Sequence, residues 1–135
     1  MKTYFAAILI VVAAQTSDTF KVRLSPVPLD ATMRANVTGK GSATATLAGN
    51  KLSISGSFEG LKSAATIAQL HQGKVTGVRG PAIADVTVSK DVRGAIEGTV
   101  NLSAEQVERL RKGQLYIQIH SEKAPDGNLW GWLLR

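Results

Sequence analysis

The chain has 135 residues, of which 44% are hydrophobic and none is cysteine. This length suits one compact domain and is short for two. The missing thiols exclude disulfide bridges, a thiol nucleophile and a cysteine-ligated metal. The formal net charge is +6, but the basic residues are scattered and only 5% of the chain is aromatic. Because the sequence contains neither a run of basic residues nor a set of aromatic residues on which bases could stack, we expect no nucleic acid partner.

The N-terminus has the pattern of a secretory signal peptide. Lys2 precedes an apolar run from Phe5 to Val12, and small residues follow at Ala13 and Ala14. Such a run is shorter than the roughly 20 residues that a membrane-spanning helix needs, so we interpret residues 1–14 as a cleaved signal. A short lead, 15–19, would then precede a domain at 20–135. The mature chain is expected to be secreted or periplasmic, without a membrane span.

Alternation of apolar and polar residues predicts an all-β domain. The connections between the expected strands are short, which is typical of two antiparallel sheets packed as an immunoglobulin-like sandwich. The eight expected strands are Phe20 to Leu24, Ser42 to Leu47, Leu52 to Phe58, Thr66 to His71, Ala82 to Val88, Ala95 to Val100, Tyr116 to His120 and Leu129 to Leu133.

One short helix is expected before the seventh strand. Ser103 and Gln106 form the S-x-x-Q pattern of a capping box, and Gly113 stands where a helix ends in the left-handed region. In the strand that follows, aliphatic residues alternate with Tyr116, Gln118 and His120. The sequence therefore places His120 at the end of a strand, on the face opposite the aliphatic one.

Turn signals define two hairpins and one loop. Gly49-Asn50 lies between alternating runs, and Pro125-Asp126-Gly127-Asn128 combines four turn-forming residues. The glycine-rich segment Gln72 to Pro81 is expected to be a surface loop, and such loops commonly carry function. Trp130 and Trp132 share one face of the last strand, and we expect at least one of them to pack. Gly131 between them indicates a bulge or a close backbone approach.

Several segments resemble the CHRD (chordin) domain, in the single-domain form found in many exported bacterial proteins. LSAEQVERLRKGQLYIQIH is similar to its "LTAEQ…L…G.LYVNVH" pattern, and TIAQLHQGKVTGVRGPAIADV to its "AAHIHGP…G.NGPVIFDL" segment. The likeness runs from about Phe20 to the end and preserves segment order. It implies an antiparallel Greek-key β-sandwich similar to that of copper-zinc superoxide dismutase, and no settled activity.

Two histidines are the only imidazoles in the chain and are its best candidates for binding a transition metal. His71 and His120 match the second histidine of "HIH" and the histidine of "NVH", so the resemblance implies that they lie at one end of the fold. Gln69 stands where the family has the first histidine of that pair. A site completed by Asp85, Glu122 or water would hold copper or zinc.

No G-x-S-x-G, H-E-x-x-H or Walker-type loop occurs, and two histidines are too few for a dismutase. We therefore do not expect an enzyme or a cofactor. The predicted function is a non-catalytic binding or structural module of the cell envelope, whose partner is a protein or another envelope component. The alternative is a copper or zinc binding protein that uses His71 and His120.

Overall fold

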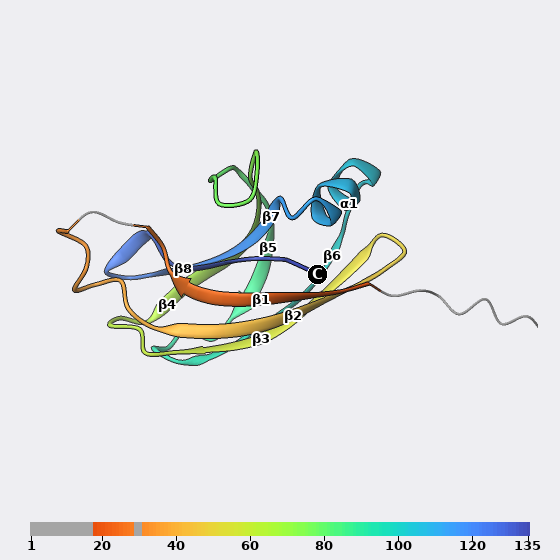
Figure 1. The fold of residues 1–135 in the computed structure, drawn as a ribbon. Helices are drawn as coiled ribbons and strands as arrows, with labels where there is room; N and C mark the ends of the chain where they lie inside the picture. Colours follow the sequence, from red (N-terminus) through yellow and green to blue (C-terminus); the bar gives the residue numbers. More distant parts are fainter. Residues whose placement is uncertain (1–17, 29–30) are drawn as a thin grey trace, which may run out of the picture.

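The computed structural model describes residues 18–28 and 31–135, so the expected signal peptide at 1–14 lies outside the described part. Within the described residues, eight antiparallel strands and one helix are arranged in the order shown in Figure 1. Their bounds are β1 Asp18–Pro26, β2 Lys40–Ala48, β3 Lys51–Glu59, β4 Ala65–Gln72, β5 Ala82–Val88, β6 Gly94–Asn101, α1 Ala104–Arg111, β7 Leu115–Ser121 and β8 Ala124–Trp132. All eight strands expected from the sequence are present.

The strands close into one barrel. Their hydrogen-bonded order is β1-β2-β3-β6-β5-β4-β7-β8, and β8 pairs back onto β1, with Ser25 opposite Trp130. Farther along, Lys21 and Leu134 exchange backbone hydrogen bonds of 2.7 and 3.1 Å. The expected Greek-key β-sandwich, immunoglobulin-like or superoxide dismutase-like, is therefore wrong. The fold is a closed, eight-stranded antiparallel barrel with one short helix.

Two short seams distinguish this barrel from a sandwich. One half of the barrel is β1-β2-β3-β6 and the other is β5-β4-β7-β8. The halves join where β1 meets β8 and where β5 meets β6, and each seam has two residue pairs in its strand register. In the second seam Thr87 lies opposite Glu97 and Val88 opposite Ile96. Alternation within a strand is the same in both architectures, so it does not reveal these long-range pairings.

The interior is filled by the apolar set of each strand. On β1, Phe20, Val22 and Leu24 point inward and are at most 3% exposed, while Lys21 and Arg23 between them face solvent. The largest side chains buried in the protein come from most of its strands and from the helix, and they are Tyr116, Phe20, Leu24, Leu52, Ile54, Leu70, Ile96, Leu110, Leu115, Ile117, Ile119 and Leu129. Except for Tyr116, these residues form one continuous core.

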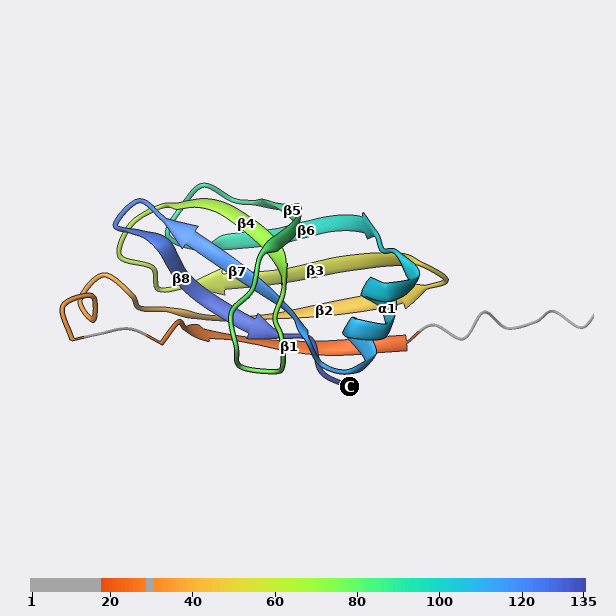
Figure 2. The same ribbon diagram turned by 90° about the horizontal axis from the view of Figure 1, so that it is seen from above.

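The helix forms as the sequence predicts. Ser103 Oγ accepts from the Gln106 amide at 3.1 Å, and Gln106 Oε1 accepts from the Ser103 amide at 2.9 Å. Gly113 has φ of 71° at the other end. Leu110 is fully buried, and the helix lies at one end of the barrel beside the C-terminus (Figure 2). Within the described residues, no helix has the length and apolarity to cross a membrane.

One of the two expected turns is misplaced. The β2–β3 hairpin turns at Gly49-Asn50, where Gly49 has φ of 61°. The β7–β8 hairpin turns earlier than expected, because Ser121 pairs with Ala124 and residues 125–128 belong to β8. Asn128 is fully buried there and its Oδ1 accepts from Ser121 Oγ at 2.8 Å. Its buried hydrogen bond favours the strand over the turn that its residue type suggests.

The outer face of the barrel is solvent-exposed on the side of β2 and β3 and buried on the side of β7. On β2 and β3 the outward residues are exposed or half-buried, and all except Ala48 have polar side chains. On β7 the outward residues Tyr116 and Gln118 are 1% and 4% exposed. The segment 73–81, drawn in green in Figures 1 and 2, rises from the ends of β4 and β5 beside β7. This covered region of the outer face contains both histidines.

Candidate functional site

The two predicted metal ligands lie on neighbouring strands. In the register of β4 and β7, His71 is opposite Tyr116 and His120 is opposite Ile67, with Gln118 between these positions on β7. The two imidazole rings nevertheless lean toward each other. Their centroids are 6.4 Å apart and their planes are 28° from parallel. The structure thus brings together the two residues selected from the sequence.

Each imidazole is held through its Nδ1 atom. His71 Nδ1 lies 2.9 Å from the carbonyl oxygen of Gly80, and His120 Nδ1 lies 2.7 Å from that of Pro125. A carbonyl oxygen only accepts, so both Nδ1 atoms carry the proton and both Nε2 atoms have a lone pair. His120 Nε2 accepts from the Gln118 amide nitrogen at 3.2 Å. His71 Nε2 is buried and has no hydrogen-bond partner among the described residues.

Gln118 is a part of the site that the sequence analysis did not select. Its Nε2 also lies 3.4 Å from the Asp126 carbonyl oxygen, and its Oε1 is buried with no hydrogen-bond partner in the described chain. A Cβ added at Gly127 would lie 3.0 Å from the Gln118 amide group. The glycine therefore leaves room for a buried amide beside the imidazoles. Strand alternation placed Gln118 on the outer face but gave no sign that this face is covered.

Aromatic rings surround Tyr116. Its centroid is 4.5 Å from that of Trp132 and 5.6 Å from that of Trp130, and the two indoles meet edge to face with centroids 5.6 Å apart. Arg79 adds its guanidinium 5.9 Å from the Trp130 ring centroid. Trp132 Nε1 is buried without a hydrogen-bond partner in the described part of the chain. The expectation that at least one tryptophan packs is confirmed, since both are half-buried in this group.

These side chains form one assembly, which we call the imidazole–aromatic cluster. It consists of His71 from β4, Tyr116, Gln118 and His120 from β7, and Trp130 and Trp132 from β8.

Segment 73–81 is fixed against the cluster. The Gly80 amide donates to the Tyr116 hydroxyl oxygen at 3.1 Å, and that hydroxyl donates to the Gly80 carbonyl oxygen at 3.0 Å. Gly73 and Thr76 bond to the chain beyond α1, with the Thr76 hydroxyl 2.6 Å from the Gly113 carbonyl oxygen. The expected surface loop is present. Its residues 74–79 are exposed, while its backbone carbonyl at Gly80 accepts the hydrogen bond from His71.

Burial keeps His71 neutral. Desolvation lowers the pKa of His71 below its ordinary value of 6.5, and electrostatic repulsion by His120 and Arg79 lowers it further, against the Gly80 hydrogen bond that raises it. The His71 Nε2 lone pair is therefore available at neutral pH.

Among the described residues, no carboxylate completes the histidine pair. Asp85 is exposed and accepts a 3.0 Å hydrogen bond from Gln69, the residue opposite it on β4. Across residues 18–28 and 31–135, no group of three or more histidine and acidic side chains is placed to hold a metal ion. The expected carboxylate ligand is thus not provided by the described chain. The atoms of the cluster that could coordinate a metal are the two imidazole Nε2 atoms and the Gln118 amide oxygen.

Comparison with curated proteins and with solved structures gave no match. The family model of the CHRD domain matches residues 15–133, nearly the whole chain. The chain therefore belongs to the CHRD domain family.

Proposed function

We propose that this protein is a non-catalytic binding module that works in the cell envelope or outside the cell and that binds its ligand at the imidazole–aromatic cluster. The CHRD family supports a non-catalytic module. The single observation that carries the proposed site is the presence of three buried polar atoms without hydrogen-bond partners in the described chain. They are His71 Nε2, Gln118 Oε1 and Trp132 Nε1.

Buried polar atoms of folded proteins are nearly always hydrogen-bonded, and one left without a partner costs about 1–3 kcal/mol. All three atoms here belong to side chains of the same cluster, whose rings lie within 6.4 Å of a neighbour. A ligand that offers hydrogen-bond donors to His71 and Gln118 and an acceptor to Trp132 would satisfy them. The chemistry of the cluster therefore suits a polar ligand with an apolar or flat portion against the indoles.

Capture from the envelope fraction tests the proposed site. The chain from residue 15 onward is used as bait beside two variants, Trp130→Ala and the control Lys123→Ala, which changes an exposed residue outside the cluster. A partner retained by the wild type and the control but lost with Trp130→Ala supports the site. Equal capture by all three proteins argues against it.

The location of the protein is tested separately. Cell fractionation followed by N-terminal sequencing of the product should find the chain outside the cytoplasm and starting near Gln15, if residues 1–14 are a cleaved signal. A cytoplasmic product that begins at Met1 would contradict export.

A second candidate function is copper or zinc binding by His71 and His120. It is favoured by the way both imidazoles donate their Nδ1 protons to backbone carbonyl oxygens. Metal-ligating histidines are commonly oriented in this manner, with the other nitrogen directed at the metal. Gln118 Oε1 adds a further acceptor beside the two Nε2 atoms, and it has no hydrogen-bond partner in the described chain. An imidazole pair with one amide oxygen and water provides the N and O donors that Zn²⁺ and Cu²⁺ accept.

Calorimetric titration with Cu²⁺ and with Zn²⁺ distinguishes the two candidates. Asparagine is the matched replacement, because its amide nitrogen can keep the backbone hydrogen bond of Nδ1 while the Nε2 ligand is lost. Stoichiometric binding by the wild type that disappears in His71→Asn and in His120→Asn supports the metal site. Absent binding, or equal binding by all three proteins, rejects the metal and leaves the cluster as a site for another ligand.

A further inference from the structure

Basic residues that are scattered in the sequence lie together with hydroxyl groups on the solvent-exposed outer face of β1, β2 and β3. The outward side chains of β1, β2 and β3 form two rows across the strands, each with one cation followed by two hydroxyls. The rows are Lys21–Thr44–Ser55 and Arg23–Ser42–Ser57, as set by the strand registers. Thr44 is half-buried and the other five side chains are exposed.

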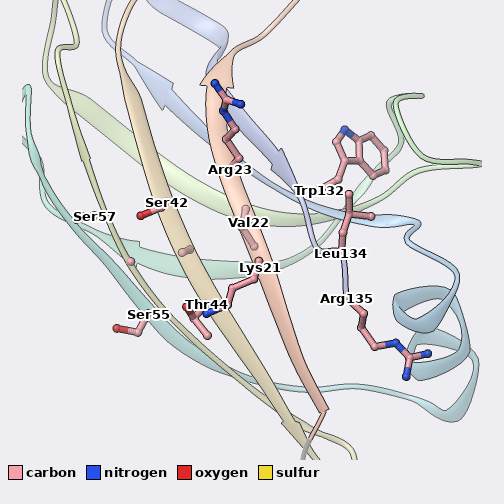
Figure 3. Close-up of a pocket in the computed structure, with 12 residues that line it drawn as sticks. Lys21, Val22, Arg23, Ser42, Thr44, Ser55, Ser57, Trp132, Leu134 and Arg135 are labelled. Atoms are coloured by element: carbon pink, nitrogen blue, oxygen red, sulfur yellow. The ribbon is translucent and has the colours of Figure 1, made fainter.

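A hollow of about 700 Å³ is lined by both rows. Figure 3 shows Lys21 reaching over β2 beside Thr44, with Trp132 on the opposite side of β1. A second hollow of about 730 Å³ shares Arg23, Ser42 and Ser57 with the first. Each hollow spans β1, β2 and β3, and the second lies farther along these strands than the first, so that together they make one groove, which we call the basic groove.

The charge of this groove is mainly positive. Arg135 lines one end, and Lys40 and Arg93 line the other. Lys40 pairs with Glu59 at 3.6 Å and Arg135 with Asp18 at 3.8 Å. The remaining carboxylate that lines the groove is Asp91, whose Oδ1 accepts from the Val92 amide at 2.6 Å.

The two cations at the centre of the basic groove are available to a ligand. In the described part of the chain, neither Lys21 nor Arg23 forms an ion pair. Both side chains are exposed, and they extend from adjacent outward positions on β1. An anionic group over either row would therefore meet an uncompensated cation.

We propose that the basic groove binds a linear anionic polysaccharide. Lysine and arginine pair with carboxylate or sulfate groups, while serine and threonine hydroxyls both donate to and accept from sugar hydroxyls. Neighbouring strands lie about 4.8 Å apart, so the rows present these groups at regular intervals to an extended chain. Neither row contains an aromatic side chain, and the half-buried Trp132 at one end of the groove is a single ring rather than a series on which successive bases would stack, which disfavours a single-stranded nucleic acid.

This inference is independent of the imidazole–aromatic cluster, apart from Trp132, which belongs to the cluster and also lines one end of the groove. The remaining cluster residues do not line either hollow of the groove. A cluster ligand and a polysaccharide would therefore meet different surfaces of the barrel.

Titration with alginate oligosaccharides at low and at 0.15 M salt tests the proposal. The Lys21→Ala/Arg23→Ala variant should bind roughly tenfold more weakly than the wild type, because two charge-assisted contacts are lost. Ser42→Ala/Ser57→Ala keeps both charges and should bind more weakly than the wild type, by a smaller factor. The matched control is Lys62→Ala/Lys123→Ala, which removes two exposed cations that do not line the groove. It should bind as the wild type does.

Three results would overturn the proposal. The first is absence of alginate binding by the wild type. The second is an equal loss in the groove variant and in the control, which would indicate an effect of net charge alone. The third is equally tight binding of single-stranded DNA of matched charge, which would indicate a general polyanion surface. Circular dichroism of each variant confirms that the barrel is folded.

Discussion

The imidazole of His71 stacks on the phenol ring of Tyr116, with centroids 4.8 Å apart and planes 19° from parallel. Both side chains also donate to one acceptor, the carbonyl oxygen of Gly80, at 2.9 and 3.0 Å. Strand β4, through His71, and strand β7, through Tyr116, are thereby hydrogen-bonded to the same carbonyl group of segment 73–81. The position of the histidine thus depends on a loop carbonyl and a neighbouring hydroxyl.

Tyr116→Phe should loosen segment 73–81 while leaving the barrel folded. The substitution removes the hydroxyl that exchanges hydrogen bonds with the amide and carbonyl of Gly80. It leaves the Gly80 amide without this partner, at a cost of about 1–3 kcal/mol. Hydrogen exchange should therefore be faster at the Gly80 amide and unchanged in β2 and β3. Protection of Gly80 equal to that of the wild type would show that the tyrosine hydroxyl does not hold the segment.

The stability of the metal-free protein should fall as pH drops below about 6.5. Because burial lowers the pKa of His71 from 6.5, the unfolded chain binds this proton at a higher pH than the folded chain does. Lowering the pH from 6.5 toward the pKa of the folded state therefore favours unfolding. Above pH 6.5 the contribution of neutral His71 to the free energy of unfolding is fully present. Urea unfolding at pH 7.5 and at pH 5.5 measures the difference.

His71→Asn is the control for this pH dependence. The asparagine amide can still donate to Gly80, but it does not titrate. The loss of stability between pH 7.5 and 5.5 should be smaller in the variant than in the wild type. An equal loss in both proteins would show that His71 is not the source of the effect.

Most local structure was predictable from the sequence, except the position of the β7–β8 turn, whereas barrel closure was not. Signals for the helix and the β2–β3 hairpin depend on neighbouring residues, and both features form where Ser103, Gly113 and Gly49 predicted them. Closure depends on pairs such as Ser25 and Trp130, which are far apart in the sequence. The edge of a sheet has the same alternation whether or not another strand pairs with it. A sandwich and a barrel are therefore indistinguishable by this pattern.

The candidate site was predictable only in part, for a similar reason. His71 and His120 were selected because imidazole is rare in this chain, and the structure brings them together. Gln118 alternates with aliphatic residues like any solvent-facing position of a strand. In the structure Gln118 is buried beside His120, the Asp126 carbonyl oxygen and Gly127, and no local pattern encodes these contacts. The lowered pKa of His71 likewise results from burial, which a local pattern does not reveal.

Gly127→Ala should displace the Gln118 amide. An added Cβ would lie 3.0 Å from Cδ and Nε2 of Gln118, and Gly127 has φ of 132°, a conformation that residues with a side chain rarely adopt. We expect a loss of about 1–3 kcal/mol in unfolding free energy and a changed chemical shift of the His120 ring. Gly49→Ala is the control, because Gly49 also has a positive φ of 61° but an added Cβ there would contact nothing within 4 Å. If only backbone strain matters, the His120 resonances will be unchanged in both variants.

Gly131→Ala should weaken the seam between β1 and β8. An added Cβ would lie 2.6 Å from the Arg23 carbonyl oxygen and 2.6 Å from Val22 Cγ1, so β1 would have to move away. Gly131 has no positive φ, which makes the cost steric, and crowding of this kind is typically worth about 1–3 kcal/mol. The amides of Lys21 and Leu134, which bond across the two chain segments at 2.7 and 3.1 Å, should exchange faster with solvent. Amides in the β2–β3 hairpin should keep their wild-type protection. Uniform loss of protection in both places would mean that the seam does not open on its own and that the barrel unfolds as one cooperative unit.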